Sequence, residues 1–149
     1  MHLSPESIDI ISRQAIVEYP SECCGIVTGA GDLQRVHTLK NIQERLHAED
    51  ADTHPRDGRT AYAADRNEVG RIIAEAAQRD ETVLAFYHSH TDADAYFSRM
   101  DKEAQTVFGE PEFPGAVHVV VSVREGVVHE IKGYFWDSAQ QDFVFVAVR

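Results

Sequence analysis

The feature that most constrains this chain is a helical pattern that runs almost directly into a short apolar segment. Within residues 66–79, apolar side chains recur at intervals of three and four, which predicts a helix with one buried face: Val69, Ile72, Ile73, Ala76 and Ala77. Residues 82–87 (TVLAFY) are rich in β-branched and aromatic side chains and predict a buried strand. A helix that leads into a buried strand is typical of an α/β fold.

The other predicted strands form two hairpins and one terminal segment. Residues 25–29 and 33–40 flank a turn at 30–32, and residues 116–123 and 127–135 flank a turn at 124–126. The C-terminal FVFVAV is a last strand and a candidate for an edge of the sheet. The order of elements predicts one α/β domain over residues 1–149, with a mixed β-sheet flanked by helices.

Two more helices and one long loop complete the prediction. Ser4 and Pro5 provide a capping hydroxyl and a proline at the first helical position, which predicts a helix over 5–18. A helix after Ser98 is expected to bury a stripe of four side chains: Met100, Ala104, Val107 and Phe108. Residues 41–60 contain eight charged residues, a proline and a glycine without a sustained period, which predicts a loop.

Composition narrows the class of protein. The 149 residues carry a formal net charge of −11, and no cluster of Lys and Arg offers a phosphate-binding surface, so we expect no nucleic-acid partner. No apolar stretch approaches the roughly twenty residues that span a bilayer. The N-terminus lacks a basic segment followed by an apolar one, so no secretory signal and no membrane partner are expected. We therefore expect a cytoplasmic protein.

The run HSHTDADAYFSRMD, directly after the strand at 82–87, carries the chemistry. Because strand side chains alternate between faces, His88 and His90 point to the same face and can bind one metal ion. Ser98 has the character of a helix N-cap, and Asp101 then lies in the first turn of that helix. Two histidines and one carboxylate leave a tetrahedral zinc with one open position, which is typical of a catalytic site.

Other interpretations of this run remain open. The histidines can be surface residues at a strand end, with Ser98 and Asp101 serving only as a helix cap. Two histidines and a carboxylate also form the facial triad of mononuclear iron enzymes, although the spacing and the α/β pattern fit that class poorly. Zinc without iron in the purified protein would separate the two enzyme classes.

The spacing His88-x-His90-x7-Ser98-x2-Asp101 resembles the motif of the JAMM (MPN+) metallopeptidase family. That family also has a glutamate ahead of a glycine-containing strand, and the segment PSECCGIVTG supplies Glu22. The resemblance extends from Leu3 to about Trp136 and implies a cytidine-deaminase-like α/β layout. Many members have proline where this chain has Thr91 and Phe97, which affects the shape of the loop rather than the ligands.

The resemblance implies a role for each motif residue. His88, His90 and Asp101 would hold Zn²⁺, Glu22 would act as general base without being a ligand, and Ser98 would donate to the oxyanion. Capping of the helix is a competing role for the Ser98 hydroxyl, and without the family Glu22 would be taken for an exposed carboxylate at a strand start.

The HSHT…AY-x-S form is most similar to the bacterial branch that acts on ubiquitin-like sulfur-carrier proteins. The implied reaction is hydrolysis of the peptide or isopeptide bond after a C-terminal Gly-Gly, with release of an amino acid such as cysteine. The tail would bind as an added strand, with help from the 41–60 loop. A non-catalytic scaffold is the alternative, although the complete ligand set argues against it. The oligomeric state stays open.

The remaining chemically active residues are given ordinary roles. Ser89 is expected to point away from the two ligands and to support the packing around them. Cys23 and Cys24 are too few for a zinc site, and one of them is expected to pack as a small apolar residue; a vicinal disulfide or a thiol beside the metal is the alternative. The other histidines are expected at surface or strand positions: His2, His37, His47, His54, His118 and His129. Of these, His47 and His54 lie in the 41–60 loop and would reach the site only if the loop folded over it.

Overall fold

A computed structural model describes all residues, 1–149. Its elements in chain order are α1 (Pro5–Glu18), β1 (Cys24–Ala30), β2 (Leu33–Leu39), α2 (Gln43–Glu49), α3 (Arg66–Gln78), β3 (Thr82–Thr91), α4 (Arg99–Ala104), β4 (Thr106–Val107), β5 (Glu110–Pro111), β6 (Val117–Arg124), β7 (Val127–Asp137) and β8 (Asp142–Val146).

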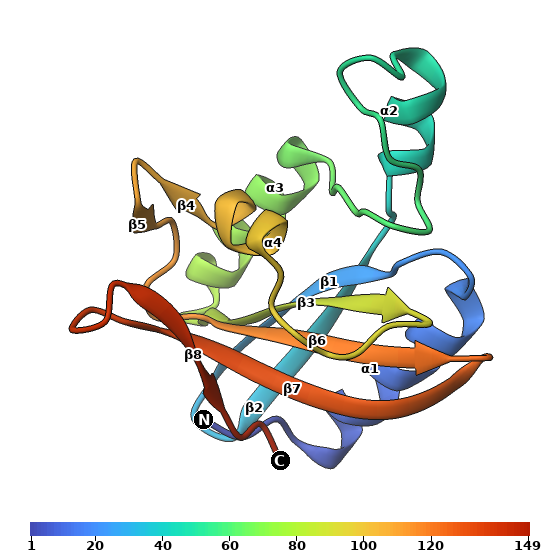
Figure 1. Cartoon of the computed structure of the whole chain (residues 1–149). Coiled ribbons are helices and arrows are strands. Elements are labelled where there is room, and N and C mark those ends of the chain that lie inside the picture. The colour runs from blue at the N-terminus through green and yellow to red at the C-terminus, as the bar shows by residue number, and fades with distance from the viewer.

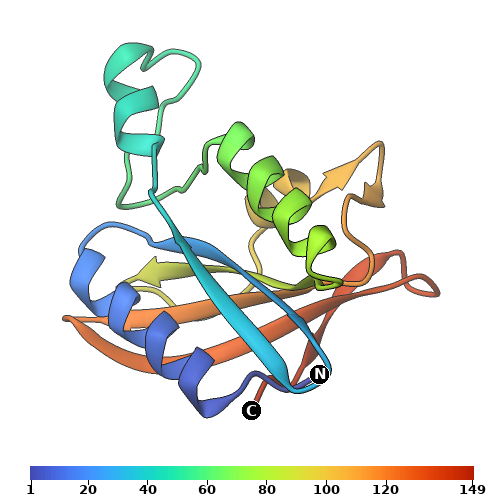
Figure 2. The ribbon, with the colours of Figure 1, turned by 180° about the vertical axis from the view of Figure 1, so that it is seen from behind.

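The mixed α/β fold predicted from the sequence is confirmed. A six-stranded sheet has the order β2-β1-β3-β6-β7-β8, in which β3 and β6 are parallel and all other neighbours are antiparallel. The last strand lies at an edge, as expected. Helix α1 covers one face of the sheet, while α3 and α4 lie over the other face, and α2 projects away from the sheet at the end where β3 finishes (Figure 1). The reverse view shows the same layers (Figure 2).

Separate apolar clusters hold the two faces of the sheet. On the α1 side, Ile11 and Ala15 pack with Tyr87, Val119 and Val121, all of them buried. On the other side, Ile72 of α3 packs with Ile26 of β1 and Leu39 of β2. Because β3 contributes to both clusters, its position is set from both sides and it provides a rigid base for its polar end.

Gly25 allows strands β1 and β3 to approach closely. A Cβ atom at this position would collide with the ring of Tyr87, which lies opposite it in the strand pairing. The Tyr87 hydroxyl donates to Gln14 Oε1 at 2.5 Å, so the ring is also held by α1. A glycine immediately after the two cysteines is therefore required by packing rather than by backbone conformation.

The prediction of a structureless loop over 41–60 is wrong in part, because Gln43–Glu49 forms α2. No side chain caps this helix at Ile42. Its residues are fixed instead by distant partners: Gln43 Nε2 donates to the Arg56 carbonyl at 2.8 Å, and Glu44 Oε2 accepts from Gly58 N at 2.9 Å. These contacts tie the helix to the rest of its own loop, and no short-range pattern signals them.

The predicted helical stripe after Ser98 is also wrong. Helix α4 ends at Ala104, and the chain then forms the β4–β5 hairpin. Phe108 and Gly109 at its tip have φ values of 51° and 78°, the signature of a type I′ turn. Phe108 is 103% exposed and Val107 is 53% exposed, so neither side chain contributes to the core. Apolar spacing alone did not reveal the turn because phenylalanine rarely occupies a left-handed position.

Candidate metal centre

The two motif histidines lie within strand β3 rather than after it. The strand continues to Thr91, because residues 88–91 pair with β6 in a parallel ladder that matches His88 with Val120 and His90 with Ser122. Both imidazoles therefore project from one face, and both are buried. Ser89 points to the other face, as the alternation predicts.

Three side chains converge at the end of β3. His88 Nε2 and His90 Nε2 lie 3.2 Å apart, and Asp101 brings Oδ1 to 3.3 Å from His88 Nε2 and Oδ2 to 3.3 Å from His90 Nε2. Asp101 reaches the histidines from the first turn of α4. The residues that the sequence proposed as ligands are thus brought together, on two elements from opposite ends of one loop.

The hydrogen bond made by the outer ring nitrogen of His90 leaves a lone pair on its inner nitrogen, which faces the other two side chains. His90 Nδ1 contacts the Asp94 carbonyl at 2.8 Å, and since a carbonyl only accepts, Nδ1 carries the proton. In the neutral ring, His90 Nε2 then presents a lone pair toward Asp101, which is itself an acceptor. A divalent cation satisfies such a set of two imidazole nitrogens and a carboxylate, so the residues present fit zinc.

The pKa values of the three groups reflect burial and mutual contact. Burial lowers the pKa of His88 even though Asp101 favours its charged form. Burial also opposes a charge on His90, but hydrogen bonds to Asp101 and to the Asp94 carbonyl outweigh it and raise the pKa. Burial disfavours the Asp101 carboxylate, yet its contacts with both histidines hold the pKa well below its usual range. Asp101 is therefore anionic and ready to bind a cation.

Ser98 and Asp101 cap α4 reciprocally. Asp101 N donates to Ser98 Oγ at 3.0 Å, and Ser98 N donates to Asp101 Oδ2 at 2.9 Å. The Ser98 hydroxyl accepts in this arrangement, so its own proton remains available to another acceptor. Capping and donation to a substrate oxygen are thus compatible roles for one hydroxyl.

Glu22 lies beside the histidines in the turn that precedes β1. It is buried, with an exposed fraction of 5%, and a carboxylate oxygen lies within 4.8 Å of ring nitrogens of His88 and His90. Burial raises the pKa of Glu22 to about 8, with Asp101 adding to the rise and His90 opposing it. Glu22 is therefore not the exposed strand-start carboxylate that its local sequence suggests. Glu22, His88 and His90 together could hold a metal ion, and Asp101 lies closer to both imidazoles than Glu22 does.

Sequence reasoning missed the side chain that positions Glu22. Asn41 Nδ2 donates to the carbonyls of Glu22 at 2.9 Å and Ala61 at 3.1 Å, while Asn41 Oδ1 accepts from Gln43 N at 3.0 Å and Ala63 N at 3.1 Å. A lone asparagine after a strand carries no signal of such a role. Asn41 gains these partners only because the turn before β1, the start of α2 and residues 61–63 come together in the fold.

Ser89 supports the same turn from the opposite side. Its hydroxyl accepts from Cys23 N at 2.7 Å, and Ser89 N donates to the Cys23 carbonyl at 3.0 Å. Cys23 and Cys24 are both buried and unoxidised, and burial raises the pKa of Cys23 to about 12. They pack as small apolar residues, and the alternatives of a vicinal disulfide or a reactive thiol find no support.

Two aromatic contacts that the sequence did not predict line the cluster. Tyr62 stacks on His88 with ring centroids 4.4 Å apart, and Tyr96 meets His90 edge-on at 4.9 Å. His118 is at a strand position, as predicted: it lies in β6, is buried, and stacks on Phe86 with centroids 5.7 Å apart. His118 Nε2 has no hydrogen-bond partner, and burial lowers its pKa to about 4.

The two departures from the family motif have clear structural roles. Phe97 is buried and stacks on Tyr134 with centroids 5.3 Å apart, which anchors the loop before Ser98. Thr91 Oγ1 donates to the Arg59 carbonyl at 2.7 Å, which ties the end of β3 to the 41–60 segment. The loop histidines stay away from the ligands, and His47 Nδ1 contacts the His54 carbonyl instead.

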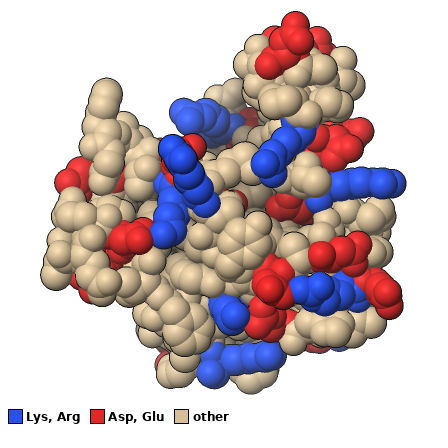
Figure 3. Space-filling view, in the orientation of Figure 1, with Lys and Arg blue, Asp and Glu red and all other residues tan.

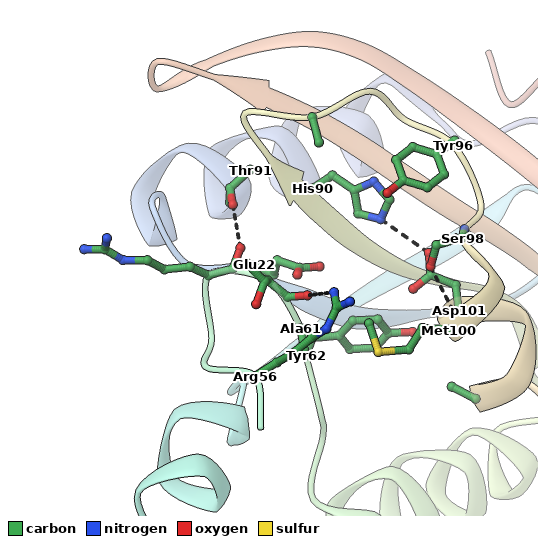
Figure 4. A pocket seen from close by; sticks show the side chains of 14 residues that line it. Glu22, Arg56, Ala61, Tyr62, His90, Thr91, Tyr96, Ser98, Met100 and Asp101 are labelled. Carbon is green, nitrogen blue, oxygen red and sulfur yellow. Dashed lines mark hydrogen bonds and ion pairs between the residues drawn. The ribbon is translucent and has the colours of Figure 1, made fainter. Parts of the chain in front are cut away.

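A pocket of about 260 Å³ opens over the cluster. Glu22, His90, Ser98 and Asp101 line it together with Arg56 from the 41–60 segment (Figure 4). Figure 4 shows Glu22 and Arg56 on one side of the cavity and Ser98 with Asp101 on the other. The pocket thus presents two carboxylates, a hydroxyl donor and a guanidinium around one point.

The mixed α/β fold and the His-x-His motif on β3 agree with a comparison to known protein families. Residues 4–137 match the family described as prokaryotic homologs of the JAB domain, and the chain belongs to this JAB (JAMM) family. The fold agrees with a solution structure of a Desulfitobacterium hafniense protein, which has a TM-score of 0.68 and 18% identity and aligns over 99% of this chain and 90% of that one.

Two curated relatives have named activities. A CysO-cysteine peptidase of Mycobacterium tuberculosis is 29% identical over 117 residues, which cover 78% of this chain and 69% of the relative. A desampylase of Haloferax volcanii is 26% identical over 106 residues, which cover 69% of this chain and 63% of the relative. None of the four helices combines the length and apolar composition that crossing a bilayer would require.

Proposed function

We propose that this chain is a zinc-dependent peptidase that hydrolyses the bond after the C-terminal Gly-Gly of a ubiquitin-like sulfur-carrier protein and releases the residue beyond it. The observation that carries the proposal is the convergence of His88, His90 and Asp101 within 3.3 Å beside the buried Glu22. The family and the two named relatives support a peptidase acting on a protein of this kind.

The residues divide the chemistry between them. Zinc held by His88, His90 and Asp101 would supply Lewis acidity that polarises the scissile carbonyl and acidifies the attacking water. Glu22 accepts the proton of that water and later gives it to the leaving amine. Ser98 donates its free hydroxyl proton to the oxygen of the scissile carbonyl as negative charge develops there.

A Gly-Gly tail suits the confined approach to this site. The rings of Tyr62 and Tyr96 flank the histidines, and glycine has no side chain to collide with them. The extended tail can pair with exposed backbone at the mouth of the pocket. Replacing the last glycine of a carrier with leucine should therefore slow its cleavage strongly.

Metal content and turnover test the proposal together. The purified chain should carry about one zinc per protomer, and His88→Ala and Asp101→Ala should lose it. Glu22→Gln should retain zinc and the fold while turnover of a carrier ending in Gly-Gly-Ala falls about 10²–10⁴-fold, because an amide cannot accept the proton. Intact-mass measurement of the carrier follows the reaction.

Several outcomes would contradict the proposal. Full zinc occupancy in Asp101→Ala would show that the ligand assignment is wrong, and loss of zinc in Glu22→Gln would make Glu22 a ligand. Iron in place of zinc would favour an oxygenase. A zinc-loaded chain that cleaves no Gly-Gly-Ala carrier, yet binds one, would be a scaffold of the same family.

A further inference from the structure

Arg56 and Arg59 stand out among the basic residues of this acidic chain. Nine of its fourteen Lys and Arg side chains form ion pairs, whereas Arg56 and Arg59 form none, although both line the pocket over the metal cluster. Basic side chains also border the face beneath α2 in the space-filling view (Figure 3). Both side chains are exposed, so neither needs an ion pair for stability, and what sets them apart is their place at the pocket.

The segment that carries them is held by hydrogen bonds from three other parts of the chain. Gln43 Nε2 of α2 donates to the Arg56 carbonyl at 2.8 Å, and Thr91 Oγ1 of β3 donates to the Arg59 carbonyl at 2.7 Å. Between them, the Gly58 carbonyl accepts from Glu22 N at 2.7 Å, and Gly58 N donates to Glu44. Arg56 Nη1 donates to the Thr60 carbonyl at 3.3 Å, which holds the guanidinium over the pocket.

The charges in the pocket do not balance once a divalent cation is bound. With Asp101 ionised and Glu22 in the deprotonated form that it needs as a base, the two carboxylates of the lining offset the two positive charges of a zinc ion. The charge of Arg56 then remains in the pocket, and Arg59, which also lines it, adds a second positive charge to its surroundings. A pocket of this kind favours an anionic ligand, and a carboxylate matches the fork of a guanidinium.

The chemistry of the site indicates where that carboxylate belongs. Glu22 returns a proton to the leaving amine, so the nitrogen of the leaving residue lies next to Glu22, and Figure 4 shows the Arg56 guanidinium on the same side. In a free amino acid the α-carboxylate carbon lies about 2.5 Å from its nitrogen. An α-carboxylate one residue beyond the scissile bond therefore falls within the pocket, while a second residue would carry it about 3.5 Å farther out.

We propose that Arg56, with Arg59 as a second positive charge, binds the free α-carboxylate of a single leaving residue and so restricts the peptidase to removing one C-terminal amino acid from its carrier. The inference rests on the proposed function and adds the recognition of the leaving group. Hydrolysis consumes one water and yields the Gly-Gly carboxylate and a free amino acid, so no further reactant is needed.

Three carriers that differ only beyond Gly-Gly test this selectivity with the zinc-loaded chain. They end in Gly-Gly-Ala with a free carboxylate, in the same sequence with a C-terminal amide, and in Gly-Gly-Ala-Ala. We expect kcat/KM for the free acid to exceed that for the amide at least tenfold, with the extended carrier also cleaved slowly, because the amide cannot form the charge-assisted pair with the guanidinium and the longer tail moves its carboxylate away.

Substitutions locate the selectivity. Arg56→Gln should bring the acid-to-amide ratio close to one by slowing cleavage of the acid alone, whereas Arg56→Lys should keep part of it. Arg66→Gln is a matched control, since Arg66 is exposed, forms no ion pair and lies outside this pocket; its ratio should stay unchanged. In the Glu22→Gln background, titration calorimetry should show tighter binding of the acid than of the amide, and Arg56→Gln should remove that difference.

The two proposals fail differently. Cleavage of no Gly-Gly-Ala carrier by the zinc-loaded chain would refute the proposed function. Equal cleavage of acid and amide would leave that function standing and refute the role of Arg56. An Arg56→Gln variant that slows acid and amide equally would show that Arg56 only positions Glu22.

Discussion

At the scale of single residues, the site depends on side chains that serve two purposes. Ser98 accepts the hydrogen bond that caps α4, and in the proposed mechanism its own proton would go to the substrate. Asp101 closes the same cap and faces both histidines. Because Asp101 takes part in the helix cap, formation of α4 also places its carboxylate beside the two histidines. The proposed site is therefore preorganised before any metal binds.

Two substitutions at Ser98 separate its roles. Ser98→Ala removes the cap and the donor, so both stability and turnover should fall, by about 1 kcal/mol and about 10²-fold. Ser98→Gly should cost only a few tenths of a kcal/mol, because glycine is tolerated at an N-cap, yet it should lose as much activity. Thermal unfolding and kcat of both variants check this. If Ser98→Gly keeps wild-type kcat, the serine only caps the helix.

Asn41 tests whether the position of Glu22 limits the reaction. Asn41→Asp keeps the acceptor that serves Gln43 N and Ala63 N but replaces the donor to the Glu22 carbonyl with an oxygen. Two facing acceptors should destabilise the turn by about 1–3 kcal/mol and lower kcat more than KM rises. Zinc content should stay at the wild-type level, because no ligand is touched; a loss of zinc would mean that Asn41 acts on the metal cluster instead.

At the scale of elements, the turn of the β4–β5 hairpin holds Phe108 in a strained backbone conformation without packing its side chain. Phe108 has a φ of 51° and is 103% exposed, so its ring gains nothing from the fold. Asparagine tolerates the left-handed conformation, and Asn-Gly is the preferred pair in a type I′ turn. Phe108→Asn should therefore raise the free energy of unfolding by up to about 1 kcal/mol. Denaturant melts measure it, and a clear loss of stability would point to a contact made by Phe108.

Helix α2 illustrates how an element can form without a local signal. It is seven residues long and lacks a capping side chain, and so would be marginal in isolation. Its bonds to Arg56 and Gly58 close the 41–60 segment on itself. Helix α2 thus helps to hold the segment that lines the pocket. The charged residues from which a loop was predicted are those of an exposed helix.

At the scale of the whole molecule, the fold should outlast the metal. Apolar clusters on both faces of the sheet support β3, and hydrogen bonds to the Asp94 carbonyl and from Ser98 N already hold His90 and Asp101, two of the proposed ligands. Chelation should abolish activity while the far-UV circular dichroism stays native, and added zinc should restore turnover. Because the metal binds the folded state, its removal should lower Tm by several degrees, and Asp101→Ala should show no zinc-dependent shift. Unfolding on chelation would mean that the metal is structural.

What the sequence determined by itself is local in range. The alternation of side chains along a strand placed His88 and His90 on one face, and the capping residues Ser4 and Ser98 marked helix starts that the structure retains. These features depend on neighbours a few residues away. The likeness to a family added roles for Glu22 and Ser98 that spacing alone would not assign, and these roles stay predictions.

Only the tertiary structure decided which distant groups meet. The pairing of β3 with β1 brings Ser89 to the backbone of Cys23, 66 positions earlier, and so buries Glu22 beside the histidines. The 41–60 segment places Asn41 behind that turn and Arg56 over the pocket. Such meetings depend on how apolar faces pack and how buried polar groups find partners across the whole chain, and no window of sequence contains both sides of those contacts.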